Sequence, residues 1–176
     1  MLLNTKGLAI LLPGYRKNDG GNITLAYLFK EKKPRILCRP LSSVIRQLQR
    51  QGHGNFIFTN ERLRTWSNCQ QLLPIPVDIN TIFFPLHFRT APQSVHDGCT
   101  AYLRLSLAFD GTLDRHKTPA REKVVLHLPS GVVFHAAANW ETFWRHATEA
   151  LDVKNALLVD NFKRLDRLTQ FLKSRT

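Results

Sequence analysis

Two histidines and a cysteine lie close enough in the sequence to suggest chemistry. His87, His96 and Cys99 follow one another with the spacing H-x8-H-x2-C. A structural zinc site needs four ligands, commonly in closely spaced pairs, and the chain contains no C-x-x-C or H-x-x-x-H pair. A thiolate beside a histidine is another use for these residues, but this spacing is not diagnostic of it. We interpret them as loop histidines and a buried free cysteine, and we expect no metal.

Other signatures of catalysis are missing from the sequence. Ser130 lies in a Pro-Ser-Gly step without the G-x-S-x-G pattern of an exposed nucleophile. Neither of the glycine-rich phosphate loops, G-x-x-x-x-G-K-[ST] or G-x-G-x-x-G, occurs. We therefore expect no enzyme and no cofactor. A small hydrolase built on the histidines and cysteine above is an alternative.

Basic residues offer a different chemistry, the binding of polyanions. The chain has 176 residues, a formal net charge of +12 and a pI of about 10.2. Between residues 30 and 50 a single acid, Glu31, stands among seven cations: Lys30, Lys32, Lys33, Arg35, Arg39, Arg46 and Arg50. Each Lys or Arg can neutralise a phosphate and release a counterion. Nucleic acid, an anionic membrane and an acidic protein are the candidate partners.

A helix over residues 40–51 would arrange part of this charge on one face. Leu41, Val44, Ile45 and Leu48 recur at helical spacing, Pro40 suits the first turn and Gly52 is a stop signal. The opposite face carries no acid, and its residues are Ser42, Ser43, Arg46, Gln47, Gln49 and Arg50. Arginine with glutamine can reach base edges or a narrow minor groove.

We name six candidate DNA-binding residues. Arg46, Gln49 and Arg50 lie on the predicted helix, and we expect the other three on loops: Arg62, Arg64 and Arg89. Arg89 follows the apolar run Ile82-Phe83-Phe84, which ends at Pro85. We interpret that run as a buried strand that delivers the loop 87–92 to the surface.

The remaining sequence predicts mostly strands. Residues 7–15 and 23–30 are joined by good turn residues and favour a hairpin, and 34–39 can add a third strand. We also expect strands at the β-rich or alternating segments 72–77, 81–86 and 99–109, and a hairpin of 124–128 with 132–136.

Two helices are expected near the C-terminus. Asn139 can cap one whose apolar face is Trp140, Phe143, Trp144 and Ala147, and we interpret its aromatic residues as core. Asp152 can cap a second, with the face Leu158, Phe162, Leu165, Leu168 and Leu172. The predicted fold is therefore α+β, a mainly antiparallel β core with an early helix and a helical C-terminus.

This organisation suggests a β-rich DNA-binding domain over 1–150 with the helix 40–51 embedded in it. The amphipathic helix of 151–176 then belongs to the same domain or is a dimerisation appendage. No run approaches the roughly 18 apolar residues of a membrane span. Cys38, Cys69 and Cys99 are odd in number and far apart, which suits a reducing compartment. We expect a cytoplasmic protein with no membrane partner.

Four segments in this order resemble the competence transcription factors of the ComK type. They are PLSSVIRQLQRQG, ERLRTW, LPIPVDINTIFFPLHFRTAPQSVHDGC and SGVVFHAAANWETFWRHATEA. The resemblance covers roughly residues 38 to 150, and its strongest part is Pro76-Val77-Asp78 with Ile82-Phe83-Phe84-Pro85 and Cys99. The sequence departs from the family at Ala101 and Tyr102, where a Trp is frequent after the cysteine.

The resemblance implies a transcriptional activator of DNA-uptake genes without a cofactor or catalytic residues. Such proteins bind paired A/T-rich boxes in double-stranded promoter DNA, largely through the minor groove, as a homodimer or dimer of dimers. As an activator the chain would also contact RNA polymerase. The family's tail, which binds a Clp-protease adaptor, has no recognisable counterpart here. From the charge alone, a basic RNA- or ribosome-associated module is the alternative.

Overall fold

The structure is a computed structural model. It describes residues 5–16, 18, 20–52, 60–67, 72–88, 100–110, 113–118 and 121–174. Only the backbone is described for Lys6, Gly52, 114–118 and 121–123. The predicted loop residue Arg89, together with His96 and Cys99, lies outside the described residues.

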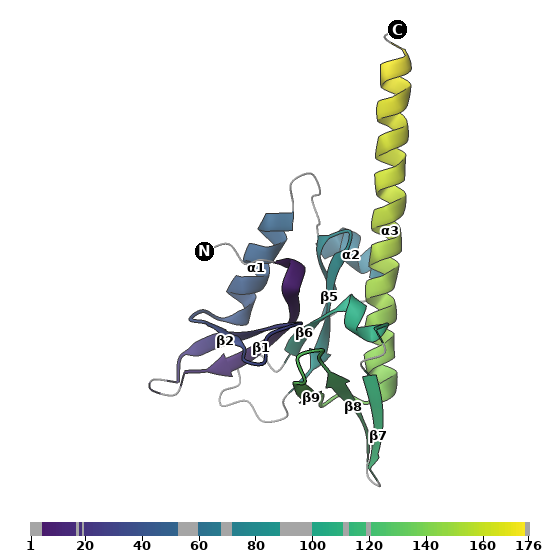
Figure 1. Ribbon diagram of the computed structural model, residues 1–176. Helices are drawn as coiled ribbons and strands as arrows, with labels where there is room; N and C mark the ends of the chain where they lie inside the picture. The colour runs from purple at the N-terminus through teal and green to yellow at the C-terminus, as the bar shows by residue number, and fades with distance from the viewer. Residues whose placement is uncertain are drawn as a thin grey trace.

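A six-stranded antiparallel sheet is the centre of the molecule (Figure 1). Its strands are β1 (Leu8–Tyr15), β2 (Asn22–Leu28), β3 (Arg35–Leu37), β4 (Ile75–Asp78), β5 (Thr81–His87) and β6 (Thr100–Arg104). They lie in the order β3-β2-β1-β6-β5-β4, and each neighbouring pair is antiparallel. The predicted hairpin of β1 and β2 and the third strand beside it are confirmed, and so is the α+β class.

Strand β5 is buried on both faces, which explains its continuous apolar sequence. Successive side chains of a strand point to opposite faces. Phe83 accordingly belongs to the cluster beneath the early helix, whereas Ile82 and Phe84 belong to the cluster beneath the C-terminal helix. This strand therefore supports both helical layers of the molecule.

Helix α1 (Leu41–Gly52) covers one face of the sheet, close to the predicted 40–51. The carbonyl of Pro40 accepts hydrogen bonds from the backbone nitrogens of Ser43 and Val44 and so starts the first turn. Val44 and Leu48 are buried against a cluster drawn from the sheet, which contains Leu8, Leu11, Ala26, Ile75, Val77 and Phe83. The apolar face predicted from the sequence is the face that packs.

Helix α2 (Asn60–Ser67) contains two residues that we had expected on loops, Arg62 and Arg64. That expectation was wrong. The segment has one buried apolar residue, Leu63, and a partly buried Trp66, which is too little for a helical period to stand out in the sequence. Packing against the C-terminal helix makes up for the weak pattern.

Strand β6 ends earlier than the predicted 99–109. A 3-10 turn, η2 (Leu105–Ala108), follows Arg104 directly. The alternation of leucines misled the prediction, because Leu105 and Leu107 are buried in the turn just as they would be in a strand. A second 3-10 turn, η1 (Thr5–Gly7), precedes β1.

A smaller sheet is formed by β7 (Leu113–Thr118), β8 (Arg121–His127) and β9 (Val133–His135) in that order. The hairpin of β8 and β9 was predicted and is confirmed. Gly131 has a φ of 83° in its turn, a conformation that glycine adopts without strain. Strand β7 was not predicted, because its sequence LDRHKT is largely polar and resembles a solvated loop.

A single helix, α3 (Trp140–Lys173), replaces the two helices predicted at the C-terminus. Asn139 caps it as expected, since its side chain accepts a hydrogen bond of 2.8 Å from the backbone nitrogen of Thr142. Asp152 lies exposed inside the helix and caps nothing. Neither Gly nor Pro separates the two predicted helices, so the helix continues. The predicted domain boundary at 150/151 falls within it.

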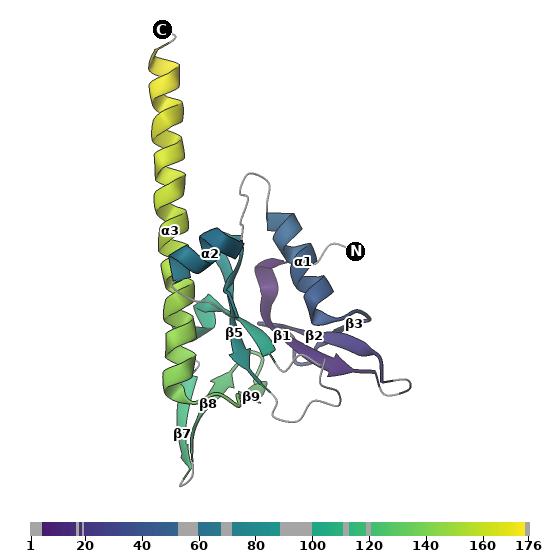
Figure 2. The same ribbon diagram turned by 180° about the vertical axis from the view of Figure 1, so that it is seen from behind.

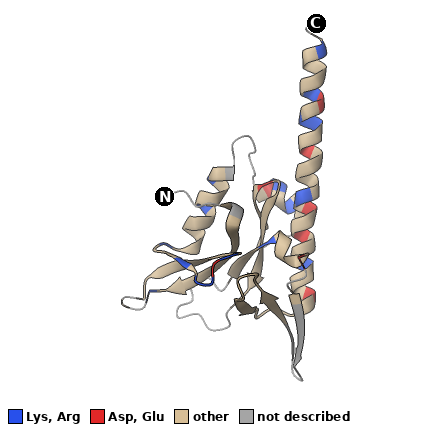
Figure 3. Cartoon of the chain, viewed as in Figure 1, with Lys and Arg blue, Asp and Glu red and all other residues tan. Residues whose placement is uncertain are grey.

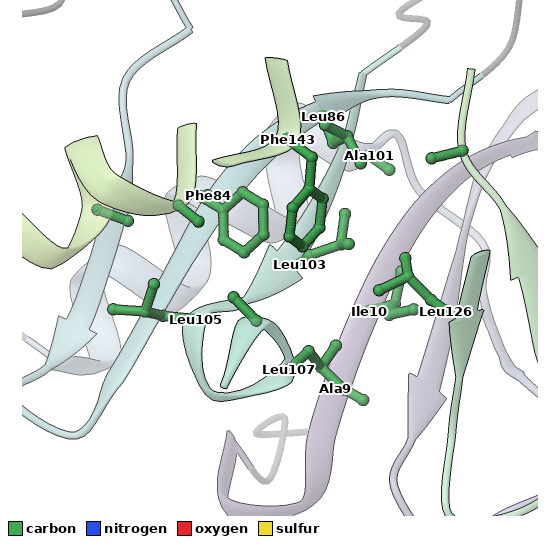
Figure 4. Close-up of a cluster of buried hydrophobic side chains, with 14 of the residues drawn as sticks. Ala9, Ile10, Phe84, Leu86, Ala101, Leu103, Leu105, Leu107, Leu126 and Phe143 are labelled. Carbon is green, nitrogen blue, oxygen red and sulfur yellow. The ribbon is translucent and has the colours of Figure 1, made fainter. Parts of the chain in front are cut away.

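The first half of α3 packs on the body, and the last buried residue of the helix is Leu157. Phe143, Ala147, Ala150, Val153 and Leu157 are buried there, and the rings of Phe143 and Phe84 meet edge to face with centroids 5.3 Å apart (Figure 4). Both ribbon views show the second half extending away from the rest of the molecule (Figures 1 and 2). Among the described residues, no helix has both the length and the sustained apolar character that crossing a bilayer requires.

Candidate nucleic-acid interface

The exposed side of α1 carries a groove with a volume of about 340 Å³, which we call the basic groove. Its lining residues come from α1 and the residue that precedes Pro40, and they are Arg39, Ser43, Arg46, Gln47 and Arg50. Arg39, Ser43, Arg46 and Arg50 follow one another three or four residues apart, and Gln47 lies beside Arg46, four residues after Ser43, so the helix places them on one side. The lining contains three guanidinium groups and no carboxylate.

Arg39 is held at the start of this stripe by the strand beneath it. The hydroxyl of Thr24, a buried residue of β2, donates a 2.9 Å hydrogen bond to the carbonyl of Arg39. The backbone nitrogen of Arg39 donates to the carbonyl of Leu37 at 2.7 Å. These two bonds fix the turn from β3 into α1, so the backbone that carries the first arginine is rigid.

Gln47 adds an acceptor to the basic groove. Its Oε1 is shielded from solvent and accepts no hydrogen bond from the residues that the structure describes. A buried polar atom left without a partner is costly. Rotation of the Gln47 side chain would present this oxygen to a ligand in the groove that offers an N–H or O–H, such as a base amino group.

A second groove, of about 450 Å³, brings together two predicted residues from different helices. Gln49 of α1 and Arg64 of α2 both line it, above apolar residues that include Leu63 and Ile75. Tyr102 of β6 lies in the same lining, and burial raises the pKa of its phenol, which therefore stays protonated at neutral pH. The groove thus presents a cation, an amide and a phenol at its surface.

Arg62 is directed elsewhere. Its guanidinium lies 3.5 Å from Oδ2 of Asp160 on α3 and 4.8 Å from the ring centre of Trp66. Asp160 also lies 3.5 Å from Nε of Arg164, one turn further along α3. The structure therefore gives Arg62 a role in holding α2 to α3, in addition to whatever it contacts in a partner.

Charge is distributed unevenly over the molecule. Residues 1–52 contain ten Lys or Arg and two Asp or Glu, so they hold two thirds of the net charge. One of those acids, Glu31, accepts a 3.1 Å hydrogen bond from Nε of Arg35, which lowers the pKa of the carboxyl. Along α3, by contrast, Figure 3 shows acidic and basic residues interspersed. The excess positive field arises mainly from the part of the chain that carries the basic groove.

The histidine and cysteine chemistry considered at the outset gains no support from the described part of the chain. No group of three His, Cys, Asp or Glu side chains there could hold a metal ion. A close histidine–carboxylate pair joins Nδ1 of His146 to Oε2 of Glu149 at 2.8 Å, within α3. His146 is buried on the body side of that helix, so the pair is part of the packing.

Sequence reasoning selected Arg46 and Arg50 but left out three residues of the basic groove: Arg39, Ser43 and Gln47. A usable signal existed, because Arg39 and Ser43 continue the spacing of the two arginines toward the start of the helix, and Gln47 lies between those arginines. The sequence did not indicate that Gln49, which lies on the same predicted face of the helix, lines a different groove together with residues of α2.

Comparisons with protein-family models, with curated proteins and with solved structures found no match. The resemblance to the competence transcription factors therefore stays a prediction.

Proposed function

We propose that the chain binds double-stranded DNA through the basic groove of α1. The observation that carries the proposal is the alignment of Arg39, Arg46 and Arg50 along one groove whose lining contains no acid. Guanidinium groups match phosphate in geometry as well as charge, because they can donate two parallel hydrogen bonds. A groove open to solvent, with three such groups, suits a polyanion better than a small buried substrate.

The dimensions of α1 suit a duplex. Its 12 residues span about 18 Å, roughly five base-pair steps of 3.4 Å. Arginines spaced along that length can follow successive phosphates or enter a narrow minor groove, where the negative potential is strongest. The amide of Gln47 adds a group that can form hydrogen bonds with base edges.

The resemblance to competence transcription factors supports a finer proposal. The chain would activate transcription of DNA-uptake genes by binding paired A/T-rich boxes, largely through the minor groove. In this proposal the second groove, with Gln49 and Arg64, contacts the duplex beside the basic groove. Arg89 remains a candidate contact from outside the described residues.

The test compares the wild-type chain with the triple variant Arg39→Ala, Arg46→Ala, Arg50→Ala. Fluorescence anisotropy would measure affinity for an A/T-rich duplex, a G/C-rich duplex and a single-stranded RNA over a range of salt concentrations. Losing three contacts at about 1 kcal/mol each should weaken duplex binding about 100-fold. The slope of log affinity against log salt should become shallower by about 0.9 for each phosphate contact removed.

A matched control removes the same charge from another exposed surface. The control is the triple variant Lys163→Ala, Arg167→Ala, Lys173→Ala, whose positions lie on the exposed half of α3. It should change duplex affinity only a few-fold. Equal losses in the two triple variants would mean that net charge alone drives binding, and the proposed site would be wrong. Tighter binding of RNA than of either duplex would favour the RNA-associated module, and equal affinity for the two duplexes would refute the A/T preference.

A further inference from the structure

The projecting half of α3 leaves a row of large apolar side chains exposed to water. The row, which we call the α3 stripe, consists of the exposed residues Phe162, Leu165, Leu168 and Leu172 together with the half-buried Leu158 at its start. Phe162 is 68% exposed, Leu165 60% and Leu172 66%. An exposed apolar surface of this kind on a globular protein generally marks an interaction site. The stripe takes no part in the DNA-binding surface proposed above.

The spacing within the stripe is that of a helix that pairs with another helix. Leu151, Leu158, Leu165 and Leu172 recur at every seventh residue. A seven-residue repeat keeps one narrow seam facing a partner helix, whereas an ideal helix on a flat surface follows a period of 3.6. The stripe is thus better matched to a helical partner than to a planar one.

Charged residues are kept off this seam. Between 158 and 172 the other positions on the same side of the helix are Asn161 and Thr169, which are polar but uncharged. The charged residues of the segment lie at its flanks or on its outer face: Asp160, Lys163, Arg164, Asp166 and Arg167. A partner that carried its own charge at the seam would leave that charge unpaired, so the stripe fits a surface of the same composition as itself.

The body of the protein limits how a partner helix can approach. Leu151 lies one heptad before Leu158 on the same side of α3, and it packs against the core cluster. The side of α3 that carries the seam is therefore occupied by the body up to that point. A partner helix running parallel to α3 would collide with the body, whereas one entering from the C-terminal end has open space (Figures 1 and 2).

We propose that the projecting halves of α3 from two copies of this chain pair antiparallel, about a two-fold axis near Leu165. In this arrangement Leu158 meets Leu172 of the second copy, and the two Leu165 side chains meet at the axis. Phe162 lies beside Thr169 of the second copy on one edge of the seam, and Leu168 lies beside its Asn161 on the other edge. The surface is self-complementary, as a two-fold interface requires.

The size of this contact sets its strength. An exposed Leu or Phe side chain buries roughly 100 Å². Four such residues and the half-buried Leu158 from each copy remove roughly 900 Å² from water, near the lower limit of a specific interface. The helix is already started and held by its packed first half, so pairing does not bear the cost of nucleation. We therefore expect a reversible dimer with a dissociation constant in the micromolar range.

The test is the oligomeric state of the full chain by analytical ultracentrifugation from low to high micromolar concentration. The wild-type chain should shift from monomer to dimer. Leu165→Lys places two cations face to face at the axis and should raise the dissociation constant at least about 100-fold. The matched control is Gln170→Lys, which adds the same charge on the outer face, next to Asp166, and should leave the dimer intact.

A second measurement tests the orientation. Leu158→Cys and Leu172→Cys chains should form an intermolecular disulfide when mixed and oxidised, identified by mass spectrometry of the linked peptides. Links between two copies of position 158, or between two copies of 172, would show a parallel pair and overturn the arrangement. A wild-type chain that stays monomeric would overturn the proposal. So would a monomer that binds anionic phosphatidylglycerol vesicles and loses that binding in Leu165→Lys, because the stripe would then be a membrane-binding face.

Discussion

Helix α1 and the second half of α3 are both amphipathic, but they present opposite faces to the solvent. In α1 the apolar residues Val44 and Leu48 are buried against the sheet, so its exposed surface is polar and basic. In α3 the apolar residues from Val159 onward are exposed, and Phe162 and Leu165 face water. The kind of partner that each helix can bind is therefore decided by which face the rest of the protein covers.

The two helices also differ in their charge. Helix α1 has two arginines and no acid, whereas α3 has six basic and five acidic residues over its 34 positions. Interspersed charges of opposite sign largely cancel at a distance, while charges of one sign add to a field that attracts a polyanion. For this reason we propose DNA as the partner of α1 and a second copy of the chain as the partner of α3.

The largest expected effect concerns the strand that supports both helices. Phe84→Ala removes a fully buried ring from the cluster under α3, and Phe83→Ala does the same under α1. Each should lower the free energy of unfolding by about 3–5 kcal/mol, measured by urea denaturation. Phe84→Leu keeps most of the apolar volume and should cost less. A small effect of Phe84→Ala would mean that α3 is not an integral part of the domain.

A smaller effect on the free energy of unfolding should distinguish the packed first half of α3 from its projecting second half. Leu151→Ala removes a partly buried side chain and should lower the free energy of unfolding by about 1–2 kcal/mol. Leu165→Ala, studied at a concentration where the chain is monomeric, should change it by less than about 0.5 kcal/mol. Thermal and urea unfolding would measure both. Equal losses of unfolding free energy in the two variants would show that the stripe packs on the body, contrary to the proposed dimer.

The smallest expected effect concerns Arg62. Its ion pair with Asp160 is about 42% exposed on the arginine side, so Arg62→Ala should lower the free energy of unfolding by no more than about 1 kcal/mol. Duplex affinity should fall less than for Arg46→Ala, because Arg62 is engaged with α3. If the two variants weaken binding equally in the same anisotropy assay, the interface extends onto α2, as the sequence had suggested.

Most elements with a strong local signal could be predicted. The turn residues between β1 and β2, the period of α1 and the asparagine cap of α3 act within a few residues, so the sequence displays them directly. Helix α2 and strand β7 were missed because their patterns are weak and are completed by packing against other segments. The division of α3 into two helices was wrong because a possible cap, Asp152, was given more weight than the missing helix breaker.

The candidate site was predictable to a similar extent. Arg46 and Arg50 could be selected because a helical period places them on the side opposite Val44 and Leu48. The second groove could not be foreseen, because Gln49 and Arg64 meet only when α1 and α2 both settle beside β4. The contact of Arg62 with Asp160 could not be foreseen either, because the two residues are far apart in the chain.

By itself, the sequence determined the net charge, the acid-free face of α1 and the seven-residue repeat of leucines in α3. These properties depend on residue type and on spacing along one element, which folding does not change. Only the tertiary structure decided which of those faces is covered. Burial and ion pairing join segments that are distant in the chain, so they depend on the complete fold. The sheet covers the apolar face of α1, whereas α3 extends beyond the body and leaves its own apolar face exposed to water.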